Sequence, residues 1–263
     1  MSRQSGFTLP ELVVVMILTV LLSALLFQFA IGYARFNAVA QSDSIAFVER
    51  LNVSDYLREN LGLSSGLINQ NSLPDANASV PESGNPTYWQ EIHAIKGTFG
   101  NTSTVTPLLY FKKPSINTSN NIVYNGTSPY EDEFILYHDG ATKQIRVRTL
   151  ANTSVTNNKL STSCPPAIAT TSCPADKVLI SDIVSVNLRY FSRSGNDITF
   201  NSIDELGNSP CTAAAPAYTG CEGGDFPIVE VVEFTLNLSK QPIGVKGNTT
   251  QSATIIRIAL RND

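Results

Sequence analysis

The sequence predicts an α+β protein in which a long N-terminal helix, membrane-spanning in its first half, packs on a mainly antiparallel β-sheet domain. Three observations support this prediction. An uncharged, apolar run of twenty residues lies at 12–31. A proline-free, amphipathic stretch follows it at 34–61. Beyond residue 107, short segments rich in apolar residues are separated by turn residues, which is typical of a β-domain.

The run at 12–31 is long enough to cross a bilayer. Its only polar residues are Thr19, Ser23 and Gln28. A helix rises about 1.5 Å per residue, so the run spans roughly 30 Å, the hydrocarbon thickness of a membrane. The apolar core of a cleaved secretory signal is usually about 7–15 residues and ends at a small-residue cleavage site. This run is longer and no such site stands out, so an uncleaved anchor is the alternative to weigh.

The residues just before the run carry a more specific pattern. The segment Gly6-Phe7-Thr8-Leu9-Pro10-Glu11-Leu12 resembles the processing motif of type IV pilins and type II secretion pseudopilins. In that family a prepilin peptidase cuts after the glycine and N-methylates the new first residue. The resemblance therefore implies a leader at 1–6, cleavage between Gly6 and Phe7, and methylation of the Phe7 amine, which keeps its positive charge.

Glu11 is the second feature of this segment. A carboxylate at the edge of an apolar span costs several kcal/mol unless it is paired. The resemblance implies that Glu11 pairs with the amino terminus of a neighbouring subunit in an assembled filament. Pro10 replaces the aliphatic residue more common in the family. It is tolerated because the first turn of a helix has no intrahelical partner for the N–H that proline lacks.

The helix is expected to continue beyond the membrane. Its expected parts are the membrane or filament-core helix at 7–33 and an amphipathic continuation at 34–62, with Gly62 as the stop. Residues 63–263 then form an extracytoplasmic, β-rich globular domain. Within it, 63–107 is loop-like, with Trp89 and Phe99 expected to hold this segment onto the body.

Strands are expected wherever apolar residues alternate with polar ones between turn residues. Asp139-Gly140 between two such runs is a strong hairpin pattern. A second turn is expected at 194–197. The expected strands are 108–111, 133–137, 144–150, 178–191, 198–200, 228–238 and 254–260.

Four cysteines lie beyond the apolar run, and their spacing suggests two local disulfides, Cys164–Cys173 and Cys211–Cys221. Three pairings are formally possible. A metal site is the weaker alternative, because neither pair has Cys-x-x-Cys spacing and both histidines are distant in sequence. Disulfides imply an oxidising compartment outside the cytoplasm.

No catalytic or cofactor motif is present, so we expect a protein without cofactor that is not an enzyme. Two acidic clusters, at 131–133 and at Glu222 and Asp225, could hold calcium, but a solvated turn is the commoner explanation. The formal net charge of −4 gives no electrostatic basis for nucleic-acid binding.

Taken as a whole, the chain is most similar to minor pilins and pseudopilins of the PilW and type II secretion J type. Major pilins are usually shorter and many have a proline in mid-helix. The resemblance implies a structural subunit that initiates or caps a filament. Its partners would be other pilin subunits, the prepilin peptidase, the cytoplasmic membrane and an assembly platform. Two alternatives stay open: a pilus-tip adhesin using 63–107 or 201–227, and a signal-anchored extracytoplasmic protein unrelated to filaments.

Overall fold

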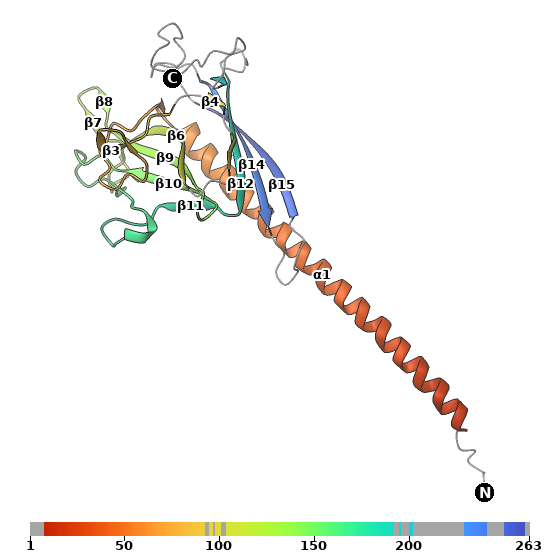
Figure 1. Cartoon of the computed structure of the whole chain (residues 1–263). Coiled ribbons are helices and arrows are strands. Elements are labelled where there is room, and N and C mark those ends of the chain that lie inside the picture. Colours follow the sequence, from red (N-terminus) through yellow and green to blue (C-terminus); the bar gives the residue numbers. More distant parts are fainter. Residues whose placement is uncertain are drawn as a thin grey trace. The chain divides into compact units, whose positions relative to one another are not determined.

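The computed structural model describes residues 8–92, 104–191, 229–240 and 250–260, with short pieces at 95–96, 98–100, 195 and 200–201. The chain divides into two compact units. The first comprises residues 1–46 with 240–250, and the second comprises 47–239 with 251–263. Each unit is described by itself, and Figure 1 labels the elements.

A single helix, α1 (Leu9–Gly62), runs through both units. Its 54 residues correspond to a length of about 80 Å. The C-terminal end is closed by Ser64, whose backbone N–H and Oγ donate to the carbonyl of Leu61 at 3.1 and 2.7 Å. The helix predicted from the sequence is therefore confirmed, with its end at Gly62 as expected.

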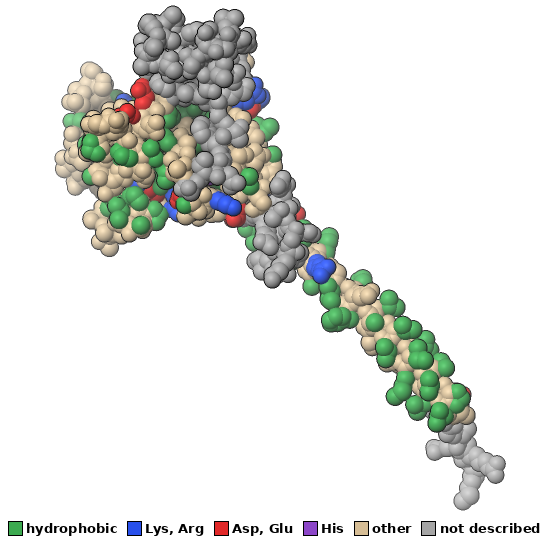
Figure 2. Space-filling view, in the orientation of Figure 1, with side chains coloured by type: hydrophobic (Ala, Val, Ile, Leu, Met, Phe, Trp, Pro, Cys, Tyr) green, Lys and Arg blue, Asp and Glu red, His purple; other side chains and the backbone are tan. Residues whose placement is uncertain are grey.

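In the first unit, the described part of α1 buries almost nothing. Every residue from 8 to 37 is exposed within this chain, including its leucine, valine and phenylalanine side chains. Figure 2 shows hydrophobic side chains along this part of the helix. This helix is long and apolar enough to cross a membrane. An apolar surface this extensive is stable only when lipid or other protein covers it.

A five-stranded antiparallel sheet forms one layer of the second unit. Its central pair is a hairpin in which Gln144 lies opposite Asp139, as the Asp-Gly pattern predicts. The strands, in their order across the sheet, are β1 (Gly66–Ile68), β6 (Val105–Pro114), β9 (Glu131–Asp139), β10 (Gln144–Leu150) and β11 (Lys177–Ile180).

A second sheet has four strands, and β12 (Ile183–Phe191) pairs antiparallel with β14 (Val231–Lys240) on one side. On its other side β12 pairs antiparallel with β5 (Thr98–Gly100), and β15 (Thr250–Ala259) lies beyond β14. The smaller elements are β2 (Pro81–Glu82), β3 (Asn85–Trp89), β4 (Ile95–Lys96), β7 (Tyr124–Asn125), β8 (Ser128–Pro129), β13 (Phe200–Asn201) and the short 3₁₀ helix η1 (Pro166–Ile168).

Two apolar clusters form the core of the second unit. The larger one unites α1, through Val53, Leu57 and Leu61, with side chains from both sheets. The smaller one lies on the other face of the five-stranded sheet and is covered by the segment before β6. Its buried members are Trp89, Tyr110, Ile135, Tyr137 and Leu150.

Two predictions of secondary structure need correction. The run 178–191 is not one strand, because β11 ends at Ile180 and β12 begins at Ile183 in a different sheet. Asp182 between them has φ 62°, a left-handed conformation that breaks an extended chain. Residues 63–107 also contain short strands rather than loop alone. Most of the predicted turn at 194–197 lies outside the described residues, as does the side chain of Phe99.

Candidate processing and assembly site

The N-terminal turn of α1 is organised by Thr8 and Glu11. Oε2 of Glu11 accepts hydrogen bonds from the backbone N–H of Thr8 at 2.9 Å and from its Oγ1 at 2.8 Å. The N–H of Leu12 donates to the Thr8 carbonyl at 3.1 Å, which closes the first helical turn. A glutamate that reaches back to the residue preceding a helix satisfies an N–H that the helix itself cannot pair. Glu11 therefore has a local structural role.

Pro10 fits this turn for the reason expected from the sequence. It occupies the second helical position, where a backbone N–H has no carbonyl four residues earlier within the helix. The proline thus leaves the hydrogen bonding of α1 intact.

Thr8 uses only one of the two carboxylate oxygens of Glu11. Both hydrogen bonds from Thr8 end on Oε2, and the side chain is exposed. Among the described residues, no donor is recorded for Oε1. The predicted cleavage residues Gly6 and Phe7 lie outside the described residues.

Among the described residues of the β-domain, Arg148 on β10 has a fully buried guanidinium. It lies between two carboxylates, with 2.9 Å from Nη1 to Oδ2 of Asp75 and 2.7 Å from Nε to Oδ1 of Asp176. All three side chains are buried. Trp89 donates from Nε1 to Asp75 at 2.7 Å, and the Tyr137 hydroxyl donates to Asp176 at 2.5 Å. We call these five residues the arginine cluster.

The arginine cluster joins three segments that are far apart in sequence. Asp75 and Trp89 come from the segment before β6, while Arg148 and Tyr137 belong to the five-stranded sheet. Asp176 lies three residues beyond Cys173. An unpaired buried charge is strongly destabilising, so each segment depends on the others to stay in place. Burial and the Asp176 carboxylate raise the pKa of Tyr137, which keeps its hydroxyl a hydrogen-bond donor at physiological pH.

Cys164 and Cys173 form a disulfide beside this cluster, with their Cα atoms 5.6 Å apart. The N–H of Asp176 donates to the Cys164 carbonyl at 2.9 Å, so the disulfide loop positions the carboxylate that faces Arg148. Both Cys211 and Cys221 lie outside the described residues, and their predicted pairing stays a prediction.

The acidic cluster at 131–133 is not a solvated turn. These residues open β9, and both Asp132 and Glu133 are buried. Glu133 accepts hydrogen bonds from the N–H groups of Ser72 and Leu73, and Glu131 pairs with Lys112 at 3.3 Å. Within the part of the chain that the structure describes, no group of three or more metal-ligating side chains is present. Glu222 and Asp225 lie outside that part.

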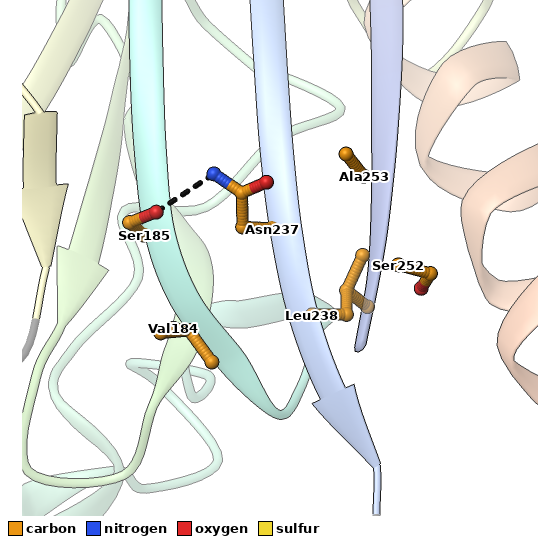
Figure 3. Close-up of a pocket in the computed structure, with 6 residues that line it drawn as sticks. All are labelled: Val184, Ser185, Asn237, Leu238, Ser252 and Ala253. Atoms are coloured by element: carbon orange, nitrogen blue, oxygen red, sulfur yellow. Dashed lines mark hydrogen bonds between the residues drawn. The ribbon is translucent and has the colours of Figure 1, made fainter. Parts of the chain in front are cut away.

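A shallow groove of about 380 Å³ crosses the ends of β12, β14 and β15 (Figure 3). Across its floor, Asn237 donates from Nδ2 to the Ser185 hydroxyl at 2.8 Å. No lining side chain is ionisable, so the groove offers no group for acid–base chemistry. The lining residues are Val184, Ser185, Asn237, Leu238, Ser252 and Ala253.

Comparison with protein families identifies a known motif in the N-terminal segment. Residues 1–27 match the family model described as the prokaryotic N-terminal methylation motif. The chain is type IV prepilin-like. No curated protein and no solved structure matches the prepilin-like chain. The matched region holds Gly6, Phe7 and Glu11, and the β-domain lies outside it.

Sequence reasoning missed two features of this prepilin-like protein. The Thr8–Glu11 cap was recognisable, because Thr-x-x-Glu at the start of an apolar helix is a known capping pattern. The arginine cluster had only a weak indication. Arg148 alternates with apolar residues as a solvent-facing strand residue does, and the sequence does not show that a distant segment covers that face.

Proposed function

We propose that this chain is a structural subunit, a minor pilin or pseudopilin, that initiates or caps a type IV pilus-like filament and has no enzymatic activity. The observation that carries the proposal is that no part of this chain covers the first half of α1 among the described residues. Its apolar side chains are exposed around the whole helix from Leu9 to Phe36, next to a methylation motif. Lipid covers such a surface before assembly, and neighbouring helices cover it in a filament.

The N-terminal turn supports a specific assembly contact. Cleavage after Gly6 would place a charged amine on Phe7, next to Thr8. Thr8 engages only Oε2 of Glu11, so Oε1 is free to accept the Phe7 amine of a staggered neighbour. Inside an apolar helix bundle this ion pair is little screened, and it would fix the axial register between subunits. The cap and the intersubunit pair are therefore compatible.

The β-domain supports placement outside the cytoplasm. The Cys164–Cys173 disulfide requires an oxidising compartment to form and persist. The expected route is a single-pass membrane protein with its β-domain extracytoplasmic, followed by transfer through an assembly platform into a filament. Other pilin subunits and the prepilin peptidase are the proposed partners.

A complementation experiment tests the proposal. Cells deleted for this protein should lose most surface or secretion filaments, and the wild-type gene should restore them. The protein itself should be present in sheared filaments at a small fraction of the main subunit. A Gly6→Val variant, which keeps the β-domain but blocks processing, is the matched control and should not restore filaments. If the deletion strain keeps normal filament numbers and loses only adhesion, the proposal is wrong and the function as a pilus-tip adhesin is favoured.

A further inference from the structure

The side chains of Asn60 and Lys113 meet where the last turn of α1 crosses β6. Nζ of Lys113 donates to Oδ1 of Asn60 at 3.0 Å, although the two residues are 53 positions apart. The Asn60 amide is held in this orientation because its Nδ2 donates to the Tyr56 carbonyl at 2.7 Å. Both side chains are half-buried. An amine and a carboxamide are thus fixed in contact.

A buried carboxylate with an unused oxygen lies beside this pair. Asp132 on β9 is directly opposite Lys113 in the β6–β9 register, so the two side chains share one face of the sheet. Oδ1 of Asp132 accepts from the Asn152 N–H and from Nδ2 of Asn158, at 2.8 and 2.7 Å. Oδ2 is buried and has no hydrogen-bond partner among the described residues. A buried acceptor left unpaired is costly and calls for an explanation.

Burial makes the amine of Lys113 easier to deprotonate than a solvated lysine amine. Nζ of Lys113 lies 5.8 Å from the centre of the Phe134 ring. Burial lowers the pKa of Lys113, while the carboxylates of Glu59 and Asp132 act in the opposite direction. A desolvated lysine with a lowered pKa is a nucleophile, and a neighbouring carboxylate can carry the proton.

We propose that Lys113 and Asn60 form an intramolecular amide bond, with Asp132 as the proton carrier. The neutral Nζ attacks Cγ of Asn60, and a C–N bond forms. Asp132 takes a proton from Nζ and delivers it to Nδ2. The Cγ–Nδ2 bond then breaks and ammonia leaves. One amide replaces another, so no oxidant, reductant or co-reactant is needed.

The chain contains a matched control for this reaction. Nζ of Lys159 also donates to an asparagine, Oδ1 of Asn120, at 2.6 Å, but both residues are exposed. There the amine stays solvated, and contact between the same two groups should not lead to a bond.

Mass spectrometry of the full-length chain, purified in detergent and reduced before digestion, tests the proposal. The expected product is one branched peptide joining Asn60 to Lys113, lighter by one ammonia than its two parts. No such product should join Asn120 to Lys159. Asp132→Asn should slow formation by roughly a hundredfold or more, since a positioned proton carrier contributes about that much. Lys113→Met should abolish the product.

The wild-type result decides between a bond and a plain hydrogen bond. If folded wild-type chain yields the Asn60 and Lys113 peptides separately and at full mass, the proposal is wrong. If the branched peptide forms equally in Asp132→Asn, the role given to Asp132 is wrong. Circular dichroism and an intact Cys164–Cys173 disulfide show that each variant is folded.

Discussion

The guanidinium of Arg148 lies 2.9 Å from the carboxylate of Asp75, and neither side chain reaches solvent. Arg148→Met should therefore leave two buried carboxylates, on Asp75 and Asp176, without a counter-charge. The expected loss is about 3–5 kcal/mol in the free energy of unfolding. Lys112→Met removes a partly exposed pair with Glu131 and should cost at most about 1 kcal/mol. Chemical denaturation of both variants measures the difference, and equal losses would contradict the role of the arginine cluster.

The disulfide should stabilise the β-domain by restricting the unfolded chain. Closing the loop between Cys164 and Cys173 contributes roughly 2.5–3 kcal/mol in the chain-entropy model. A Cys164→Ser, Cys173→Ser double variant should lose that amount in denaturant unfolding. Peptide mapping without reductant should also recover Cys211 joined to Cys221. Free thiols at all four positions in native protein would overturn the extracytoplasmic placement.

His138 should make the domain sensitive to mild acid. It is buried in β9, and both ring nitrogens lack a hydrogen-bond partner among the described residues. Burial lowers its pKa, while Asp139 acts in the opposite direction. Between that lowered pKa and the unfolded value of about 6.5, the unfolded chain binds more protons. Stability should therefore be fully present above about pH 6.5 and decline as the pH falls below it.

His138→Phe tests this pH dependence. The variant should flatten the acid limb of a plot of unfolding free energy against pH. A His138→Phe curve that is parallel to wild type from pH 7 to 5 would exclude His138 as the cause.

Processing should produce a mature chain that begins at Phe7. Terminal mass spectrometry of protein from cells containing the peptidase should show N-methylated Phe7, and Gly6→Val should retain the leader. A mature start beyond residue 20 would contradict the prepilin interpretation.

The two functions of Glu11 should be separable. Thr8→Ala removes the hydroxyl bond of the cap, a change that costs about 1 kcal/mol of helix stability, and should leave filament incorporation near wild type. Glu11→Gln keeps a cap acceptor but removes the charge, so incorporation should fall while membrane levels stay constant. Comparing membrane and sheared-filament fractions measures both effects. If Glu11→Gln enters filaments as well as wild type does, the proposed pairing of Glu11 with the Phe7 amine of a neighbour is wrong.

Local patterns were enough to predict much of the fold. The apolar run, the Gly62 stop and the Asp139-Gly140 hairpin are encoded by residues close in sequence, and all three appear in the structure. Features that depend on distant segments were not predictable in the same way. The split at Asp182 depends on which sheet each half joins, and the burial of Asp132 depends on Asn152 and Asn158.

The same distinction between local and distant residues applies to the candidate site. Gly6, Phe7 and Glu11 were identified because the processing motif is a short contiguous segment. In the arginine cluster, Arg148 contacts Asp75 across 73 positions of sequence, and Lys113 contacts Asn60 across 53. Without a way to pair those segments, Arg148 and Lys113 look like ordinary surface cations on strands.

The junction between α1 and the body also has a mechanical consequence. After Gly62 the chain enters β1, which pairs with β6 through only three residue pairs, Gly66–Lys112 to Ile68–Tyr110. A pulling force applied along α1 would load this short ladder and the Val53, Leu57 and Leu61 contacts first. A covalent link from Asn60 to Lys113 would carry that tension directly into β6, an inner strand of the sheet. Stretching a single molecule from its N-terminal end would then release the helix from the body only after the sheet itself gave way.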